Sequence, residues 1–411
     1  MILSCFLLVR EKGYTNNLDY SYGMEGLTMK KILILKIFTL CLLLIAASSS
    51  LAQKIETKDG IRVFSKSGLL LPGITGAEKS LDIKWGTPLE VGRADLLFAS
   101  ISSICEDEKG NFYLLDRIEH KVFKFSGDGQ LLLKFGGKGE GPGDFIRPSR
   151  ITITPQGQVA VADDMYHISF FQPDGIFITR LQLSNRLDIG FIGQDRFYAW
   201  IWRPEDKQQV MLDRENNIIK TFNSLAKGLF SVSAPDSSGR AVMFNYAPDE
   251  YAPSLIYAHN GNFTAIAISN SYEILILDNK GNISKKILRN IKPEKIGKKE
   301  KTYYTRDIEK ITKKRGWPKS VARKLTKNIP KEKTYFDKIL LSPQHVFVVR
   351  IKSDITQEDT SYPIDIFSLQ GSFIGTVRFM EKPIYLSGDK MYFVKSGKEG
   401  NVYLVRKSYT L

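Results

Sequence analysis

A degenerate internal repeat constrains the fold of this chain more than any other feature of its sequence. The two clearest copies span 104–125 (ICEDEKGNFYLLDRIEHKVFKF) and 151–171 (ITITPQGQVAVADDMYHISFF). Each copy has a strand-like start, a glycine turn, an alternating strand ending in aspartate, and a third strand before an Asp-Gly turn. The strand-ending aspartates, Asp116 and Asp163, are 47 residues apart. Short alternating strands separated by Gly, Asp and Asn turns are typical of antiparallel sheets.

Weaker copies of this unit continue to the end of the chain. They lie at 195–222, 262–288, 338–379 and 383–411, which gives six units. A period of about 40 to 50 residues with four strands per unit is typical of β-propeller blades. The repeat therefore predicts an all-β fold, a six-bladed β-propeller of four-stranded antiparallel blades. Two hairpins of an unrelated β-sandwich are the alternative, which the regular repetition disfavours.

The connection between the two clear copies carries a glycine-rich signature. Phe135 to Phe145 reads FGGKGEGPGDF, and this run resembles the inter-blade signature of bacterial six-bladed β-propeller proteins related to NHL-repeat proteins. The resemblance is specific over 104–175 and holds as a pattern up to Leu411. It implies that a strand from the opposite terminus closes the ring, and 81–91 (LDIKWGTPLEV) is the expected donor. A closed ring leaves no open sheet edge.

The N-terminal region predicts export. Residues 29–52 (MKKILILKIFTLCLLLIAASSSLA) combine two lysines, an apolar stretch and small residues before Gln53, as a secretory signal peptide does. The apolar run of about 16 residues is shorter than the ~20 that span a bilayer, which disfavours a membrane anchor. Residues 1–28 are interpreted as an upstream extension created by a wrongly assigned start, and 53–411 as the propeller.

We therefore expect an exported protein, periplasmic or extracellular, with no transmembrane segment after signal cleavage. Cleavage leaves Cys105 as the single cysteine. One cysteine can form neither an internal disulfide nor a four-cysteine zinc site. Cys105 is expected to be a small, buried apolar residue of a strand.

Residues 291–335 interrupt the strand pattern with a basic segment. It holds 16 Lys and Arg against 5 Asp and Glu, so it carries most of the chain's net charge of +15. Val321, Leu325 and Ile329 recur every four residues. Together with the lack of strand alternation over 307–315 and 320–328, this spacing predicts a helical insertion in the propeller.

The charge of this insertion suggests an electrostatic contact with an anionic glycan, an anionic lipid headgroup or an acidic protein. Nucleic acid is not the expected partner of an exported protein. A solvated excursion from a propeller loop is the alternative. The candidate cations are Lys313, Lys314, Arg315, Lys319, Arg323 and Lys324.

Two further groups of residues are candidates for ligand binding. Arg147 and Arg150 flank the start of the innermost strand of the second clear blade, and in a propeller such starts lie near the mouth of the central channel. They would face either an anionic ligand or an acidic residue of a neighbouring blade. Trp200 and Trp202 alternate along one strand just before Arg203. They would either stack on a sugar ring or pack between blades.

Sequence signals for catalysis and metal binding are weak. Neither G-x-S-x-G nor H-E-x-x-H occurs, and the glycine-rich run lacks the phosphate-loop pattern. His120 and His167 follow Asp116 and Asp163 by four residues, and a turn role for these aspartates is preferred over metal ligation. The catalytic residues stay unknown and no metal ligand or cofactor is assigned, although a calcium site with oxygen ligands stays open.

The preferred hypothesis is an exported, non-catalytic binding or scaffold propeller that presents a rigid face to a peptide, a glycan or a protein of the cell envelope. The alternative is a calcium-dependent hydrolase or lyase of the lactonase type that uses the central channel. Acidic and amide oxygens converging to about 2.3–2.6 Å from one point in the channel would favour the enzyme. A channel lined by apolar and arginine side chains would favour the binder.

Overall fold

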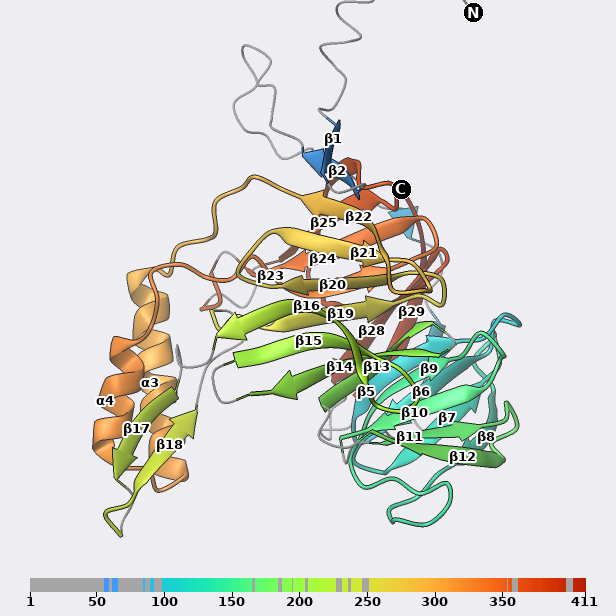
Figure 1. Cartoon of the computed structure of the whole chain (residues 1–411), viewed down its shortest axis with the longest axis horizontal. Coiled ribbons are helices and arrows are strands. Elements are labelled where there is room, and N and C mark those ends of the chain that lie inside the picture. The colour runs from blue at the N-terminus through green and yellow to red at the C-terminus, as the bar shows by residue number, and fades with distance from the viewer. Residues whose placement is uncertain are drawn as a thin grey trace, which may run out of the picture. The chain divides into compact units, whose positions relative to one another are not determined.

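Antiparallel sheets succeed one another along the chain in the computed structural model (Figure 1). Residues 54–411 form one compact unit. The predicted extension 1–28 and the predicted signal peptide 29–52 lie outside the described residues. The structure describes residues 55–58, 61–65, 84–85, 89–91, 98–164, 167–183, 187–193, 195–203, 206–226, 231–235, 238–245, 251–352, 354–356, 361–396 and 402–411.

The first three blades each consist of four strands that are consecutive in sequence and pair antiparallel in chain order. Blade 1 contains β5 (Ile101–Glu106), β6 (Phe112–Asp116), β7 (Lys121–Phe125) and β8 (Leu131–Phe135). Blade 2 contains β9 (Pro148–Ile153), β10 (Val159–Asp163), β11 (His167–Phe171) and β12 (Phe177–Gln182). Blade 3 contains β13 (Leu187–Gly193), β14 (Arg196–Trp202), β15 (Asp206–Leu212) and β16 (Ile218–Ala226).

The last three blades follow the same plan, and strands from the N-terminal side of the chain are added to blades 4 and 6. Blade 4 contains β19 (Leu255–His259), β20 (Thr264–Ile268), β21 (Glu273–Leu277) and β22 (Ile283–Leu288). A hairpin of β1 (Ile55–Lys58) and β2 (Ile61–Ser65) extends it, with β2 parallel to β22. Blade 5 contains β23 (Phe336–Leu341), β24 (His345–Arg350), β25 (Tyr362–Ser368) and β26 (Phe373–Phe379). Blade 6 contains β27 (Pro383–Ser387), β28 (Lys390–Ser396), β29 (Val402–Thr410) and β4 (Leu89–Val91).

Strand β4 closes the ring of blades. Its three residues pair with 404–406 of β29, and β3 (Lys84–Trp85) pairs with the end of the same strand. The described residues of the predicted donor segment, 81–91, thus supply the closing strand. The first strands of the blades adjoin in the order β5, β9, β13, β19, β23, β27 and back to β5. The chain therefore forms a closed six-bladed propeller, as predicted.

The hydrophobic core lies between adjacent blades. Strands β6 and β10 are buried along their whole length, because each has a strand on both sides and a blade on both faces. One cluster joins Tyr113 and Leu115 of blade 1 to Val159 and Phe171 of blade 2, and Cys105 is buried in it as predicted. Each fully buried large side chain contributes roughly 1.5–3 kcal/mol. Packing between blades therefore holds the first strands in fixed positions.

The repeated aspartates fix the loops that lead into the first strands. The Asp116 carboxylate accepts the N–H of Ala99 at 2.8 Å and that of Ile118 at 3.0 Å. In the same way the Asp163 carboxylate accepts the N–H of Ile146 at 2.8 Å. Both carboxylates are buried, and such hydrogen bonds satisfy them there. The predicted turn role is confirmed for Asp116, which also accepts the N–H of Glu119, whereas the Asp163 carboxylate accepts N–H groups of the loop before β9.

The glycine-rich connection 136–143 forms a compact turn between blades 1 and 2. The Phe145 ring lies so close to Gly136, which has φ of +86°, that an added Cβ would be 2.3 Å from the ring. Only glycine combines this conformation with this approach. Arg180 of β12 donates at 2.9 Å to three carbonyl oxygens of the connection, those of Glu140, Gly141 and Asp144.

The basic insertion is helical, as predicted, and lies between β22 and β23. Helix α3 spans Lys298–Lys314 and α4 spans Lys319–Lys327. The predicted apolar face of Val321, Leu325 and Ile329 is buried. No helix among the described residues is long and apolar enough to cross a bilayer.

Helix α3 begins at Lys298, nine residues before 307–315, the first stretch of the insertion whose sequence lacks strand alternation. Glu300 accepts the N–H of Gly297 at 3.1 Å and so caps the first turn. Tyr304 and Ile308 then continue a buried stripe at a spacing of four residues. The apolar stripe of α3 has only these two members, and this is too few to reveal the helix start in the sequence.

A hairpin that the sequence analysis did not predict covers the helices. It consists of β17 (Ser231–Pro235) and β18 (Ala241–Asn245), from the connection between blades 3 and 4. Its residues Val232 and Phe244 join the buried faces of α3 and α4 in one hydrophobic cluster. We call residues 231–245 and 298–329 the helix–hairpin lobe. Figure 1 shows it at the lower left.

Candidate functional site

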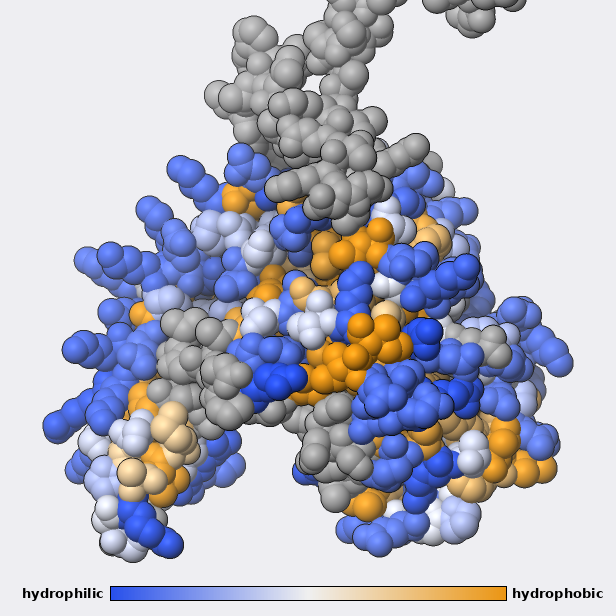
Figure 2. All heavy atoms as spheres, in the orientation of Figure 1, coloured by the Kyte–Doolittle hydropathy of each residue, from blue (hydrophilic) through white to orange (hydrophobic). Residues whose placement is uncertain are grey.

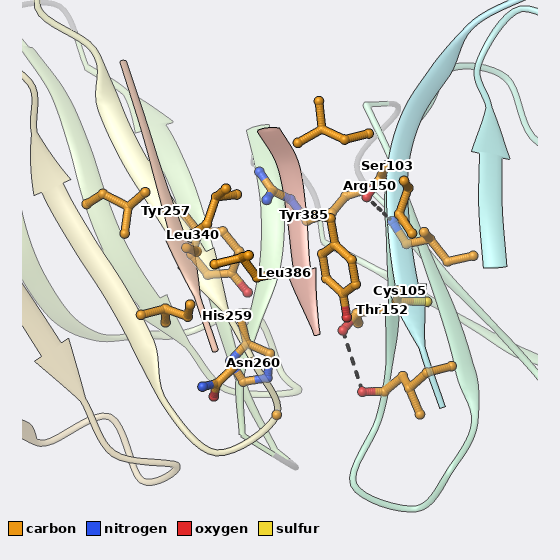
Figure 3. A pocket seen from close by; sticks show the side chains of 18 of the residues that line it. Ser103, Cys105, Arg150, Thr152, Tyr257, His259, Asn260, Leu340, Tyr385 and Leu386 are labelled. Carbon is orange, nitrogen blue, oxygen red and sulfur yellow. Dashed lines mark hydrogen bonds between the residues drawn. The ribbon is translucent and has the colours of Figure 1, made fainter. Parts of the chain in front are cut away.

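The first strands of the blades surround a cavity, the central channel. Its volume is about 1020 Å³, and residues of β5, β9, β19, β23 and β27 line it together with Trp200 of β14. Figure 3 shows the side chains that enter it from several blades. Ligand-binding pockets typically have volumes of about 300–1,000 Å³. The channel is thus large enough for a small ligand or for the end of a chain, and it is the candidate functional site.

Arg150 projects from β9 into the channel. Its guanidinium carbon lies 4.6 Å from the ring centroid of Tyr257 on β19. The Tyr257 hydroxyl accepts the N–H of Phe191 at 2.7 Å and donates to the carbonyl oxygen of the same residue at 2.5 Å. At Gly190 an added Cβ would lie 2.5 Å from Tyr257 Cζ, so glycine makes the space for this ring. The guanidinium therefore stacks on a fixed aromatic platform.

Lys338 enters the same cavity from β23. Its pKa is lowered from 10.5 to about 8, first by burial, then by the charge of Lys382, and less by Arg150, while Asp337 acts in the opposite direction. Arg150 and Lys338 both line this cavity. An anion bound in the channel would be attracted by both.

His259 contributes a neutral polar group to the channel. Its pKa is lowered from 6.5 to about 4, chiefly by burial, and Arg150 lowers it further. The imidazole is therefore uncharged at physiological pH, and its Nδ1 lies 2.9 Å from Thr264 Oγ1. The neighbouring Asn260 also lines the cavity, and its amide donates to the carbonyl oxygen of Ser342 at 2.9 Å.

Three acidic residues that line the channel, Glu106, Asp164 and Asp337, are paired with neighbouring cations, and Glu108 lines it as well. Glu106 also accepts a hydrogen bond from the Tyr392 hydroxyl at 2.7 Å. A carboxylate engaged in this way is a poor calcium ligand, because binding the metal would break its ion pair. The pairs are Glu106 with Lys390 (2.6 Å), Asp164 with Arg117 (3.0 Å), and Asp337 with Lys382.

No group of three or more His, Cys, Asp and Glu residues that could hold a metal ion occurs in the described part of the chain. The repeated histidines have other contacts. The ring nitrogens of His120 lie 2.8 Å from the carbonyl oxygen of Ile118 and 2.9 Å from that of Ile146. His167 is buried in β11, 3.9 Å from the Asp163 carboxylate.

The wall between blades 6, 1 and 2 is held by side chains that bind the backbone. The hydroxyl of Ser103 accepts the N–H of Ile151 at 3.2 Å. The hydroxyl of Tyr385 accepts the N–H of Glu106, also at 3.2 Å. Burial raises the pKa of Tyr385, so its hydroxyl stays neutral at physiological pH. This part of the channel therefore offers polar but uncharged groups.

The structure separates the two arginines that the sequence singled out together. Arg150 lines the channel, whereas Arg147 is exposed and is not among the lining residues. The backbone N–H of Arg147 instead donates to the Asp163 carboxylate at 3.0 Å. Three residues of strand are enough to move a side chain from the loop into the channel.

The aromatic pair of β14 is only partly described. Trp200 lines the channel, and its indole N–H donates to the Tyr198 hydroxyl. The backbone of Trp202 belongs to β14, but its side chain lies outside the described residues. Arg203 is exposed and donates to the Gln208 side chain at 3.1 Å.

The candidate cations of the insertion are all exposed on the helix–hairpin lobe, and none of them lines the channel. Arg315 stacks on the Trp317 ring at 4.9 Å from its centroid. Lys324 donates to the carbonyl oxygen of Ser233 at 2.7 Å. Lys313, Lys314, Lys319 and Arg323 complete the set.

Sequence reasoning missed four channel residues, and three of them lie in the middle of a first strand. The missed residues are Tyr257, His259, Lys338 and Tyr385. The predicted third and fourth units, 195–222 and 262–288, begin one strand late, because β13 and β19 were not recognised as first strands. A correct register for all six first strands would have placed these residues in the channel, since the third residue of β9 is Arg150 and that of β19 is Tyr257.

A family profile described as "6-bladed beta-propeller" matches residues 78–245, from the closing strand through blade 3 to the hairpin. The structure shows the fold that this description names, a closed ring of six blades. The match confirms the predicted resemblance to bacterial six-bladed propellers over the region that carries the glycine-rich signature.

Two solved structures are similar to this chain at low sequence identity. A candidate exported protein from Bacteroides fragilis is 12% identical, with a TM-score of 0.52 over 82% of this chain and 98% of its own. Virginiamycin B lyase from Staphylococcus aureus is 10% identical, with a TM-score of 0.40 over 80% of this chain and 99% of its own. Identities this low bear on the fold alone.

A curated relative resembles part of the propeller. Peptidyl-glycine alpha-amidating monooxygenase A from Xenopus laevis is 28% identical over 164 residues, which are 38% of this chain. The chain spans only 17% of the length of the frog enzyme. The match therefore covers a minor part of both proteins.

Proposed function

We propose that this propeller is an exported binding protein whose central channel takes an anionic ligand, a carboxylate or phosphate group carried by a peptide or glycan of the cell envelope. One observation carries the proposal: Arg150, stacked on the fixed ring of Tyr257, lines the channel together with the partly buried cation of Lys338. A guanidinium binds carboxylate and phosphate through two parallel hydrogen bonds. A neighbouring ammonium adds charge without a directional requirement.

The rest of the channel fits a binding role. Its lining combines apolar residues of the first strands with neutral hydrogen-bonding groups, among them His259, Asn260 and Tyr385. Such a mixture favours the binder over the calcium-dependent hydrolase. Three of the acids that line the channel are engaged with Lys390, Arg117 and Lys382, which leaves Glu108 as a lining acid outside these pairs.

Export is part of the proposal and rests on two supports. Residues 29–52 have the pattern of a signal peptide. A protein of the same fold from Bacteroides fragilis is described as a candidate for export. N-terminal sequencing of the protein recovered from a secreting bacterial host is the check. We expect it to begin at Gln53, and a chain that keeps residues 29–52 would contradict export by cleavage.

Ligand binding is tested by thermal unfolding of the chain from Gln53 onward with a panel of anions and their neutral analogues. Acidic dipeptides, uronic-acid oligosaccharides and sugar phosphates form the three arms of the panel. A ligand at a hundred times its Kd stabilises the folded state by about 2.7 kcal/mol. We expect at least one anionic arm to raise Tm and its uncharged analogue to leave Tm unchanged.

The Arg150→Gln variant locates the site, with Arg147→Gln as its matched control. Both substitutions remove one positive charge at the start of blade 2, but only Arg150 lines the channel. We expect Arg150→Gln to weaken binding by roughly 10- to 100-fold, the loss of a charge-assisted hydrogen bond of about 1.5–3 kcal/mol. Equal affinities of the two variants, measured by titration calorimetry, would place the ligand elsewhere.

A further inference from the structure

The central channel has two ends, one at the starts and one at the ends of the first strands. Neighbouring first strands lie in register, because the N–H of Ile151, fourth in β9, donates to the hydroxyl of Ser103, third in β5, at 3.2 Å. Two exposed residues line the channel at its ends. Arg117 lies beside the start of β5, and Glu108 lies in the turn after β5. Each end of the channel therefore reaches the surface.

The level near the strand starts is cationic. Arg150, Tyr257 and Lys338 are each the third residue of a first strand, and all three line the cavity. The Arg150 guanidinium stacks on the Tyr257 ring, so these two side chains meet at one level. In the proposed function this level holds the anionic group of the ligand.

The next level is uncharged, and the end of the channel beyond it is acidic. The fifth residues of four first strands line this level, and Figure 3 shows their side chains: Cys105, Thr152, His259 and Leu340. Glu106 and Glu108 follow at the end of β5 and in the turn after it. Lys390 pairs with Glu106, whereas Glu108 is exposed and lies outside this pair. The channel is thus cationic at one level and acidic at its far end.

The distance between the two charged levels matches a short extended peptide. Ser103 lies at the level of Ile151, next to Arg150, and Glu106 is three residues further along β5. A strand rises about 3.3 Å per residue, so Glu106 lies roughly 10 Å beyond the cationic level, and the turn with Glu108 lies a few Å further. An extended peptide of three or four residues, at about 3.3–3.6 Å per residue, would bridge this distance.

We propose that the ligand of the channel is a peptide of three or four residues with both termini free, its carboxylate at Arg150 and Lys338 and its ammonium at Glu108. The proposal rests on the anion site of the proposed function and extends it to the opposite end of the channel. In every blade the first strand is the end strand of its sheet. The edge of such a strand can pair with the backbone of an extended peptide, which favours a peptide over a glycan.

Titration calorimetry with oligo-alanines of two to six residues tests the proposal on the chain from Gln53 onward. Salt is kept at about 50 mM, where screening is weak. We expect the affinity to be highest for the peptides of three or four residues. At that length, acetylation of the amino terminus should weaken binding roughly two- to fivefold, the loss of one exposed ion pair. Amidation of the carboxyl terminus should weaken it roughly 10- to 100-fold.

The blocked peptides separate failure of this inference from failure of the proposed function. Weaker binding on amidation, without any change on acetylation, would keep the anion site and overturn the role of Glu108. No binding of any oligo-alanine would overturn the peptide, and the proposed function would still stand if uronic-acid oligosaccharides or sugar phosphates raise Tm. If neither block changes the affinity, the peptide is held elsewhere and the inference fails whatever the other anions show.

The Glu108→Lys variant locates the ammonium, with Glu119→Lys as its matched control. Both substitutions reverse a negative charge at an exposed position of blade 1, but only Glu108 lines the channel. We expect Glu108→Lys to weaken binding of the unblocked peptide roughly three- to tenfold, because an attractive pair becomes a repulsive one. It should not weaken binding of the acetylated peptide, and Glu119→Lys should weaken neither. Equal affinities of the two variants for the unblocked peptide, with wild-type Tm in both, would contradict the proposal.

The exposed cations of the helix–hairpin lobe are the competing site for the peptide carboxylate. Figure 2 shows hydrophilic side chains along the outer side of the helices, where these cations lie. Binding at such an open surface would depend on the charge of the peptide but not on its length or its free amino group. An affinity that is independent of length would therefore place the peptide on the lobe and overturn the inference.

Discussion

Arg150 and Lys338 bring two cations of different physical character into the channel. The guanidinium stays charged throughout the physiological range and is oriented by the Tyr257 ring. The Lys338 ammonium is compact and strongly hydrated, so burial disfavours its charged form and lowers its pKa to about 8. Perturbed groups in a cleft are typical of functional sites. At the residue scale, the channel is therefore suited to bind an anion, and the partly buried charge of Lys338 lowers the stability of the fold.

Replacing Lys338 should therefore stabilise the protein while it weakens the binding of the anion. The folded-state pKa of about 8 lies below the unfolded value of 10.5. The cost of burying the charge is thus present at pH 7 and disappears as the pH rises from 8 to 10.5. We expect Lys338→Met to raise the free energy of unfolding at pH 7 by about 1–3 kcal/mol. Urea denaturation measures it.

The pH dependence provides the internal check for this variant. Between pH 8 and 10.5 the advantage of Lys338→Met over the wild type should shrink, and the wild type should lose affinity for anions as Lys338 is neutralised. Lys280→Met, at an exposed position, is the control and should show neither effect. A less stable Lys338→Met protein at pH 7 would contradict the burial argument.

At the scale of the elements, a buried ion pair ties α3 to the propeller. Glu300 is 3% exposed and pairs with Lys333 after α4. The same carboxylate accepts the N–H of Ile355 at 3.2 Å, and Lys333 donates to the carbonyl oxygen of Lys352 at 2.9 Å. The helix start, the end of the insertion and the loop after β24 therefore meet at one pair of charges.

Breaking this ion pair should lower the stability of the lobe. Removing one partner of a buried ion pair leaves the other charge uncompensated, at a cost of about 3–5 kcal/mol. We expect Glu300→Gln to destabilise the lobe by roughly this amount, and Glu309→Gln, exposed on the same helix, to have little effect. Hydrogen exchange of α3 is the measurement. Equal protection of α3 in the two variants would show that the pair does not hold the helix.

The elements also show where sequence reasoning succeeds and where it fails. Asp116 marks its turn in the sequence, because the local hydrogen bonds to Ile118 and Glu119 demand a short acceptor side chain there. The hairpin β17–β18 has no such marks. Its strands, SVSAP and AVMFN, are held by contacts with helices more than fifty residues further along the chain. Contacts of that separation leave little trace in local periodicity.

At the scale of the whole molecule, the site exists only because the ring closes. Strand β4, at 89–91, pairs with β29 at the opposite end of the sequence. Closure brings the first strands of all blades around one channel, so that Arg150, Tyr257, Lys338 and Tyr385 line a common cavity. The repeat predicted the ring, and the position of Arg150 at an inner strand followed from it. Tyr257 was missed because the predicted fourth unit, 262–288, begins after β19, whereas Lys338 and Tyr385 lie within the predicted fifth and sixth units and were not followed into the channel.

The most direct test of the channel as an anion site is a crystal structure of the chain from Gln53 onward soaked with 4-bromobenzoate. This ligand joins a carboxylate to an aromatic ring, and its bromine is located by anomalous scattering. The account predicts a bromine peak inside the channel and carboxylate oxygens within hydrogen-bond distance of Arg150 and Lys338. Peaks confined to the basic surface of the lobe, with the channel empty, would contradict it.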